Sequence, residues 1–248
     1  MEKDEKMLLS SLIDKAKRTE QKNIPVYSSF LDLHMQSLAT AQQKQYGCTF
    51  LLWGGYDEAE RKIAVFLPDY LEEVPEDMLK AVRVDVKNTV KLTHRDYLGS
   101  VLGTGLKREQ IGDILPDSDG AYVLIKPDVA DFLSQNLIKV ARENVSCSVL
   151  DLSEISFAPP EPKGEMVVSA NSLRLDKITA EAFKVSRTDA ASNILAGKVF
   201  VNQREVLKPD FLVNEGDKVT FRGKGKAELS ELLGLSKKGK QRLVIKIY

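Results

Sequence analysis

A proline-rich segment near residue 160 divides the chain into two parts that are expected to fold separately. Residues 158–165 read Ala-Pro-Pro-Glu-Pro-Lys-Gly-Glu, so three of the nine prolines fall within four positions. Proline lacks an amide hydrogen and disfavours helix, and such a cluster is typical of a linker. The 248 residues suffice for two or three small domains, each with its own core. We therefore expect a linker over 158–165 and a last domain over 166–248.

The two parts carry opposite charge. Residues 166–248 hold 16 Lys and Arg against 9 Asp and Glu, whereas residues 1–165 hold 20 against 27. The formal net charge of zero therefore conceals a basic part and an acidic part. A basic domain attracts polyanions, nucleic acids above all. The imbalance predicts a polyanionic partner for the last domain.

The composition argues against several other classes of protein. The first thirty residues are rich in lysine and glutamate and contain no apolar run like that of a signal peptide, and no stretch approaches the roughly 20 apolar residues of a membrane helix. Cys48 and Cys147 are far apart and have no neighbours at zinc-site spacing. The sequence predicts a cytoplasmic protein without membrane contact, metal or required disulfide.

The part before the linker is expected to hold two regions, 1–80 and 81–157. The first is read as a small α/β region with helices at about 6–18 and from Ser28 or Ser29 to Ala41, followed by a hairpin around Gly54-Gly55. In the second, helical spacing and alternation predict helices and strands packed as an α/β sandwich. These elements are a strand at 82–86, a helix at 94–102, a strand at 121–125, a helix at 127–137 and a strand at 145–150.

The last domain is predicted to begin with two short helices. Ser172 is placed to cap the first, and Ser186 is placed to cap the second, with Asp189 in its first turn. Gly197 follows the second helix, as expected of a residue in the left-handed conformation at a helix end. Alternation then predicts short strands at 198–202 and 243–247, and the residues 213–219 predict a turn feeding another strand.

One residue in this domain opposes the local electrostatics. Arg187 lies in the first turn of the second helix, where a positive charge is unfavourable by roughly 0.3–1 kcal/mol. A phosphate bound there would reverse the sign, because it would meet backbone amides and a guanidinium together. Pairing of Arg187 with a carboxylate such as Asp176 explains the arginine equally well. The residues alone leave both interpretations open.

The spacing of these residues resembles the S-four RNA-binding domain, first seen in small-subunit ribosomal protein four. The matching pattern is Arg174-Leu175-Asp176, Ser186-Arg187, Gly197-x-Val199-x-Val201-Asn202 and Gly216-Asp217. The resemblance implies two helices on a small bent sheet, with an RNA-binding face around the helices. Gln203 departs from the family, which places glycine there, and this puts the local turn type in question. The positions that the resemblance assigns to RNA binding are Arg174, Asp176, Lys177, Ser186, Arg187, Lys198, Asn202 and Arg222.

Two basic loops containing glycine follow the matching region. Their lysines could follow a phosphate backbone, while the glycines allow the chain to approach closely. Solubilising surface loops are the alternative. We expect the RNA-binding surface to extend to Lys224, Lys226, Lys237, Lys238 and Lys240, with a second contact at Arg95, Lys107 and Arg108.

The sequence contains no convincing catalytic arrangement. His94-Arg95-Asp96 matches the start of a kinase catalytic loop, but Val101 stands where that loop needs asparagine. The glycines at 99–112 match neither a P-loop nor a dinucleotide fingerprint. Pseudouridine synthases often carry the S-four module, so Asp96 as their nucleophile is the enzymatic alternative. A helix cap explains Asp96 better. We therefore predict no enzymatic activity, no metal and no cofactor.

Signatures in the front part resemble the bacterial YlmH family, and the resemblance covers nearly the whole chain. They are the runs 93–103 and 107–114, preceded by Gly54-Gly55-Tyr56 and Glu60-Arg61. The resemblance implies an α+β fold with a ferredoxin-like, or RNA-recognition-like, middle domain over 81–157. It also implies a non-enzymatic RNA-binding protein, linked to cell division and to ribosome-associated quality control on the large subunit. The implied partners are structured ribosomal RNA and tRNA. A scaffold whose acidic front part binds a protein is a further alternative.

Overall fold

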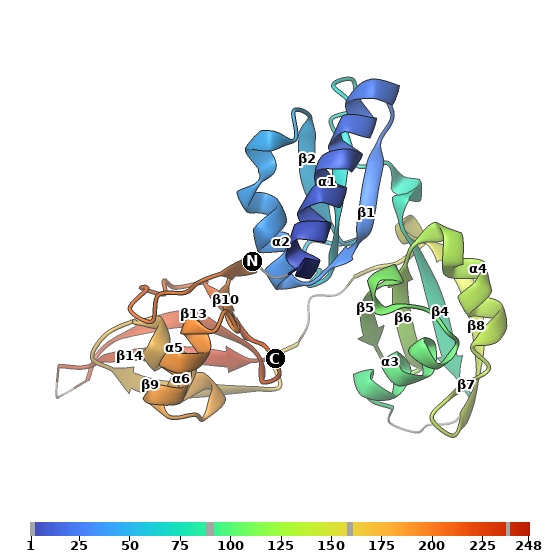
Figure 1. Cartoon of the computed structure of the whole chain (residues 1–248). Coiled ribbons are helices and arrows are strands. Elements are labelled where there is room, and N and C mark those ends of the chain that lie inside the picture. Colours follow the sequence, from blue (N-terminus) through green and yellow to red (C-terminus); the bar gives the residue numbers. More distant parts are fainter. Residues whose placement is uncertain (1–2, 88–91, 158–160, 237–238) are drawn as a thin grey trace. The chain divides into compact units, whose positions relative to one another are not determined.

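The computed structural model describes residues 3–87, 92–157, 161–236 and 239–248. The chain forms two compact units, Met1–Phe157 and Ala158–Tyr248. The described residues build three sheets, of three and five strands in the first unit and of six strands in the second (Figure 1). This mixture of helices with mainly antiparallel sheets confirms the predicted α+β class.

The first sheet contains β1 (Val26–Leu31), β3 (Lys62–Leu67) and β2 (Thr49–Trp53), in that order and antiparallel. The hairpin predicted around Gly54-Gly55 is the β2–β3 pair. Helices α1 (Lys3–Lys22) and α2 (Leu33–Ala41) cover one face, where Leu12 and Phe66 share a buried core. On the other face, Ile63 and Val65 belong to a second buried cluster. The sheet is therefore covered on both faces.

Strand β1 corrects the prediction that a helix opens at Ser28 or Ser29. Residues 26–31 pair with β3 instead, and the Ala64 amide donates to the Ser28 hydroxyl at 2.9 Å. The helix begins only after Asp32, whose carboxylate accepts the Met35 amide at 2.9 Å. Serine favours helix caps in general, but here pairing with a distant strand determines its conformation.

The second sheet has the strand order β5-β6-β4-β8-β7. Along the chain, its elements follow the order βαββαβ of the ferredoxin-like fold, with β7 and β8 closing the sheet as a short hairpin. The predicted helices and strands are all present, whereas β5 and β7 were missed. The elements are β4 (Lys80–Val86), α3 (His94–Gly103), β5 (Ile111–Pro116), β6 (Gly120–Ile125), α4 (Pro127–Asn136), β7 (Lys139–Val140) and β8 (Glu143–Asp151). Single turns of 3₁₀ helix lie at Gln43–Gln45, Glu76–Met78, Arg108–Gln110 and Leu152–Glu154.

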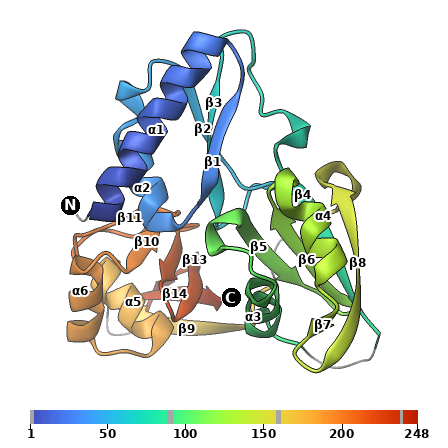
Figure 2. The same ribbon diagram turned by 45° about the vertical axis from the view of Figure 1, so that its right-hand side comes forward.

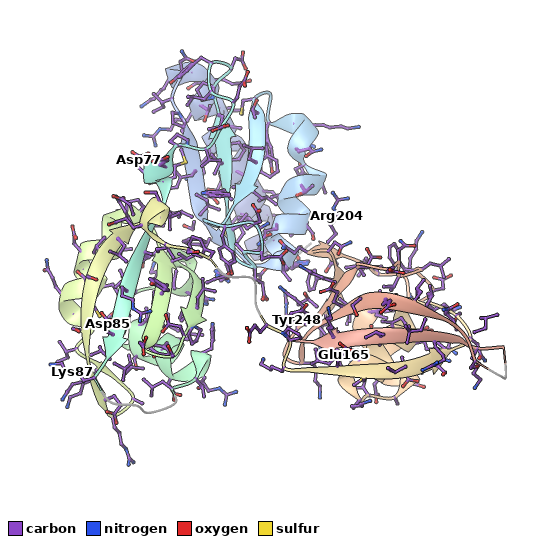
Figure 3. The ribbon with its side chains drawn as sticks, turned by 180° about the vertical axis from the view of Figure 1, so that it is seen from behind. Asp77, Asp85, Lys87, Glu165, Arg204 and Tyr248 are labelled. Atoms are coloured by element: carbon purple, nitrogen blue, oxygen red, sulfur yellow. The ribbon has the colours of Figure 1, made fainter. Side chains whose placement is uncertain are left out.

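Alternation along β4 separates the two faces of this sheet. Val82 and Val84 pack with helical residues such as Leu133 in the core. Asp85, labelled in Figure 3, and Arg83 lie on the opposite face, where the guanidinium stands 4.6 Å from the centre of the Tyr122 ring. In a ferredoxin-like fold this face of the sheet is the one open to a partner. Here Arg83 already covers the Tyr122 ring on that face.

The second unit is a six-stranded sheet in the order β11-β10-β12-β13-β14-β9. Helices α5 and α6 lie on one face of it (Figure 2). Leu175, Ile178 and Ile194 from these helices share a buried core with Val219 and Leu243 of the sheet. The elements are β9 (Gly164–Ala170), α5 (Leu175–Phe183), α6 (Arg187–Leu195), β10 (Val199–Val201), β11 (Arg204–Glu205), β12 (Lys218–Phe221), β13 (Gly225–Leu235) and β14 (Gln241–Ile247).

Two local predictions for this unit are wrong, and two are confirmed. Strand β9 begins at Gly164, opposite Ile247, so the last two residues of the expected linker belong to the sheet. Arg174, not Ser172, precedes α5 at its N-cap. Ser186 caps α6 by accepting the Asp189 amide at 3.0 Å, and Gly197 follows that helix with a φ of +67°.

The turn between β10 and β11 answers the question that Gln203 raised. Asn202 and Gln203 both have positive φ, 49° and 65°, which is the two-residue hairpin turn that Asn-Gly favours. The Asn202 side chain donates to Asp217 at 2.7 Å and accepts the Lys218 amide at 2.9 Å. These two bonds hold the turn in the left-handed conformation without the glycine.

Candidate nucleic-acid interface

Two arginines of the second unit converge on one buried carboxylate. Arg174 Nη2 lies 3.0 Å from Asp176 Oδ2, and Arg187 Nε and Nη2 each lie 3.1 Å from the same oxygen. The Asp176 side chain is only 6% exposed, whereas those of Arg174 and Arg187 are 37% and 57% exposed. We call Arg174 and Arg187 the arginine pair. One carboxylate thus orients two guanidinium groups that remain open to solvent.

The backbone around α5 explains this placement. The Leu175 amide donates to Phe211 O at 2.8 Å, and the Asp176 amide donates to Pro209 O at 2.9 Å. Residues before β12 therefore satisfy the first amides of α5, which a side-chain cap would otherwise have to satisfy. This arrangement fixes Asp176 below the surface, where the arginine from α6 can reach it.

The charges of this cluster do not cancel. Burial alone would raise the pKa of Asp176, but the hydrogen bonds and positive charges of Arg174 and Arg187 lower it below its ordinary value. Asp176 is therefore ionised at neutral pH, and one negative charge faces two positive charges. The excess positive charge lies on the exposed guanidinium groups, whose forked donors match phosphate oxygens.

Asp176→Asn is expected to weaken the acid sensitivity of the second unit. Because the folded pKa lies below the ordinary value of about 3.9 for an aspartate, the ionised carboxylate stabilises the fold above about pH 4, and this contribution is lost as the pH falls through the folded pKa. Thermal unfolding followed by far-UV circular dichroism between about pH 2 and 6 should change less in the variant, which is also less stable at pH 7. Equal acid dependence of the two proteins would show that Asp176 does not supply this stability.

The arginine pair resolves the two interpretations of Arg187 that the sequence left open. The ion pair with Asp176 forms, at 3.1 Å, and the guanidinium still remains more than half exposed. Pairing and availability to a phosphate are therefore compatible. The backbone amides at the start of α6 are less available to a phosphate. The Ser186 hydroxyl already accepts the hydrogen bond of one of them, and Asp189 provides a negative charge in the first turn.

Three of the expected RNA-binding residues have structural partners instead of exposed polar groups. Asp176 is buried beneath the arginine pair. The Ser186 hydroxyl accepts the Asp189 amide and donates to the Asp189 carboxylate at 2.7 Å. The Asn202 side chain holds its turn. These contacts explain why the fold needs those residue types. Any effect of replacing them on RNA binding would act through the backbone or through the arginines that they position.

The remaining basic residues lie in separate places on this unit. Lys177 borders a groove of about 260 Å³ between α5 and α6, which Arg187 and Glu181 also line. The Arg222 amide donates to Lys198 O at 2.9 Å, so these two residues are neighbours where the paired strands β10 and β12 begin and end. The Arg222 guanidinium lies 5.7 Å from the centre of the Phe200 ring. Lys177 thus extends the arginine pair, whereas Lys198 and Arg222 form a second basic group.

The two basic loops do not form one continuous surface. Lys224 precedes β13 and Lys240 follows it, and the 11 residues of this strand span about 35 Å. Lys226 lies at the Lys224 end, since its carbonyl accepts the Tyr248 amide at 2.9 Å. Figure 3 labels Tyr248 and Glu165 at this end of the sheet, away from the tip of the β13–β14 hairpin. Lys237 and Lys238 lie outside the described residues. An RNA that contacts both loops would therefore have to extend over about the length of β13.

The enzymatic alternative receives no support from the geometry of Asp96. Its carboxylate accepts the Thr93 amide at 2.8 Å and the Thr93 hydroxyl at 2.6 Å, closing a capping box at the start of α3. These bonds, made to a single oxygen, lower the pKa of Asp96. The His94 side chain at the same helix start is exposed as a whole, but partial desolvation of its ring and the charge of Arg108 lower its pKa. The helix-capping interpretation of Asp96 is confirmed.

Within the described residues, no helix is both long and apolar enough to cross a bilayer. The same residues contain no group of three His, Cys, Asp or Glu side chains that could hold a metal ion.

The sequence supplied Arg61 and Asp113 only as parts of the family signatures, and in the structure they lie in a dense polar cluster of the first unit. The Asp113 carboxylate accepts the Tyr56 hydroxyl at 2.9 Å and the amides of Glu60 and Arg61 at 2.7 and 3.0 Å. The residues meet across about 50 positions of sequence, so no local pattern could have predicted the contact. The one local signal of this contact was Arg61, a charged residue directly before the buried strand β3.

Two family models match the chain. The model described as "Putative RNA-binding domain in YlmH" matches residues 78–154, which include the ferredoxin-like region. The model described as "S4 domain" matches residues 173–219, which include the arginine pair and both helices of the second unit. The two matches agree with the resemblances stated from the motifs.

A protein and a solved structure resemble the chain over most of their own length. "Ribosome-associated protein quality control protein P2" of Bacillus subtilis (strain 168) is 30% identical over 246 residues, which cover 97% of this chain and 94% of that protein. The structure titled "Cell division protein ylmH from Streptococcus pneumoniae" matches with a TM-score of 0.53 and 22% identity, covering 62% of this chain and 95% of that one. At this identity the second match establishes the fold alone.

Proposed function

The chain belongs to the YlmH family, and from that premise we propose that it binds structured ribosomal RNA or tRNA on the large ribosomal subunit, without catalysis, through the arginine pair. The name of the Bacillus relative supports a place in ribosome-associated quality control. Such a role would put the protein in the cytoplasm.

The exposed arginine pair is the observation that carries this proposal. Two guanidinium groups held by one buried carboxylate form a rigid cationic site, since neither arginine has to be ordered when RNA arrives. A forked donor on each side of one carboxylate suits two phosphate oxygens of a backbone. RNA helices are recognised mainly through phosphates and 2′-hydroxyls, so affinity is expected to depend on RNA shape more than on sequence.

The charge distribution supports the choice of partner. The second unit carries the excess of Lys and Arg, and Lys177 extends the arginine pair along the groove between α5 and α6. Lys198 and Arg222 would contact a second stretch of the same RNA or a neighbouring helix. The absence of catalysis is supported by Asp96, whose capping role leaves the enzymatic alternative without its nucleophile.

Sedimentation of the full-length protein with ribosomes tests the proposal. A tagged wild type, run through a sucrose gradient of cell lysate at low and moderate salt, should travel with the large subunit. Arg187→Gln should shift toward the top of the gradient, and Lys163→Gln, which removes one exposed positive charge elsewhere in the second unit, should not. Wild type at the top at both salt concentrations, or equal behaviour of all three proteins, would argue against docking through the arginine pair.

A further inference from the structure

A second pair of arginines meets in the first unit, far along the chain from the S-four module. Arg61 follows the β2–β3 loop and Arg108 follows α3, yet both donate to the Ile111 carbonyl oxygen, Arg61 Nε at 3.0 Å and Arg108 Nη1 at 2.8 Å. These two nitrogens therefore lie within about 6 Å of one another, whatever the angle at the oxygen. Like charges this close repel each other unless an anion compensates them.

No carboxylate forms an ion pair with either guanidinium group in the part of the chain that the structure describes; Asp32, Asp113 and Glu60 act on Arg61 only from a distance. Their other acceptors are backbone carbonyls: Phe30 O and Arg108 O for Arg61 Nη2, at 3.2 and 3.3 Å, and Gly112 O for Arg108 Nη1, at 3.0 Å. Arg83 in the same unit is different, because it forms ion pairs with both Asp85 and Asp117. The fold thus neutralises one half-buried arginine and leaves two others without an ion pair.

Asp113 is one of three carboxylates that act on this pair, and its hydrogen bonds lead elsewhere. Its oxygens accept the Tyr56 hydroxyl and the backbone amides of Glu60 and Arg61, at 2.7 to 3.0 Å. With Asp32 and Glu60 it favours the charged forms of the two arginines, yet the pKa of Arg61 and that of Arg108 both remain lowered, with burial as the largest cause. Burial and then the charge of Arg61 lower the pKa of Arg108 to about 10, as expected of cations that lack a close counter-charge.

Several donors of the two guanidinium groups are not used by these bonds. Arg61 uses Nε and Nη2, and Arg108 uses Nη1, so Nη1 of Arg61 and Nε and Nη2 of Arg108 can donate to a ligand. His94, at the exposed start of α3, is close enough for the Arg108 charge to lower its pKa. The carbonyls fix the planes of both guanidinium groups, and so they hold the unused donors in place.

We propose that Arg61 and Arg108 form a phosphate-binding site of the first unit, with His94 at its edge. A phosphate oxygen accepts from the guanidinium forks and supplies the direct ion-pair partner that both arginines lack. The ligand is a phosphate group, either of an RNA backbone or of a small phosphorylated molecule. The site is separate from the arginine pair of the second unit and stands without the function proposed for it.

The single tryptophan provides a selective test. Trp53 lies in β2, so tryptophan fluorescence reports unfolding of the first unit only. Thermal unfolding of the full-length protein is measured in about 20 mM inorganic phosphate and in sodium chloride of equal ionic strength. Binding to the native state raises the midpoint, by a few degrees for a millimolar site. Phosphate should therefore raise the wild-type midpoint above that in chloride, and no difference between the salts would overturn the proposal.

Variants separate binding from a purely structural role of the arginines. Arg108→Gln should lose the phosphate-dependent rise, whatever its starting midpoint, and Arg108→Lys should retain part of it. The matched control is Arg83→Gln, a half-buried arginine whose ion pairs are already complete, which should respond to phosphate like wild type. An equal rise in Arg108→Gln and wild type would overturn the assignment to these residues.

A third arm distinguishes the two sources of phosphate. A short RNA oligonucleotide is added at the same phosphate concentration to the full-length Arg187→Gln variant, in which the arginine pair is disrupted. A larger rise with RNA than with inorganic phosphate supports a backbone ligand, and a rise with inorganic phosphate alone supports a small phosphorylated ligand. Failure of the ribosome experiment would leave this result standing, because the two measurements report on different units.

Discussion

Arg187→Gln is expected to lower the affinity of the full-length protein for structured ribosomal RNA by about 10- to 100-fold. A hydrogen bond to a charged group contributes about 1.5–3 kcal/mol, and Arg187 presents a guanidinium that is 57% exposed and held in place by Asp176. Removing one phosphate contact should also reduce the slope of the logarithm of the binding constant against the logarithm of the salt concentration by about one. Fluorescence anisotropy with a labelled ribosomal RNA fragment, repeated at several salt concentrations, measures both quantities.

The neutral substitution is preferable to charge reversal for this test. From the sequence alone, charge reversal at Arg187 is predicted to weaken RNA binding without an appreciable loss of stability. In the structure, Arg187 is one of two partners of the buried Asp176, so a glutamate would place a second negative charge beside it. Reversal is therefore expected to destabilise the fold, which would confuse lost binding with lost structure.

The controls for Arg187→Gln follow from the same geometry. Lys163→Gln removes an equal charge from an exposed side chain and should change the affinity less than about twofold. Far-UV circular dichroism should give the two variants similar unfolding midpoints, since Arg174 still pairs with Asp176. If Arg187→Gln binds RNA like wild type over the whole salt series, the arginine pair is not the RNA-binding site.

Asp113→Ala is expected to reduce the free energy of unfolding of the first unit by about 3 kcal/mol. The Asp113 carboxylate accepts two backbone amides and one tyrosine hydroxyl at 2.7 to 3.0 Å, joining the β2–β3 loop to β5. Truncation leaves these donors without an acceptor, and each loss costs about 1–3 kcal/mol where water cannot replace it. It also removes one of the carboxylates whose charge acts on Arg61 and Arg108.

Urea unfolding followed by Trp53 fluorescence measures this effect in the first unit. Asp119→Ala is the matched control, because it removes an exposed carboxylate from the turn between β5 and β6 and should change stability by less than about 0.5 kcal/mol. Equal stability of Asp113→Ala and wild type would mean that other contacts hold the two sheets of this unit together.

Local signals were sufficient for most helices, including the two helices of the last domain. Gly197, with a positive φ, and Ser186, whose hydroxyl accepts an amide three residues later, act where their chemistry predicted. Pro127 begins α4 as a proline at a first turn should. These features depend on neighbours within one helical turn, so the sequence determines them without reference to the rest of the fold.

The tertiary structure decided whatever depends on residues distant in sequence. Residues 28–31 form a strand because β3 pairs with them, and β9 extends into the expected linker because β14 pairs with it. The same holds for function: the sequence placed Arg187 on a helix, but only the fold brings it to Asp176 and leaves its outer edge in solvent. Capping and periodicity act over a few residues. Strand pairing and the convergence of charged side chains depend instead on tertiary contacts between distant segments, and these contacts position both pairs of arginines.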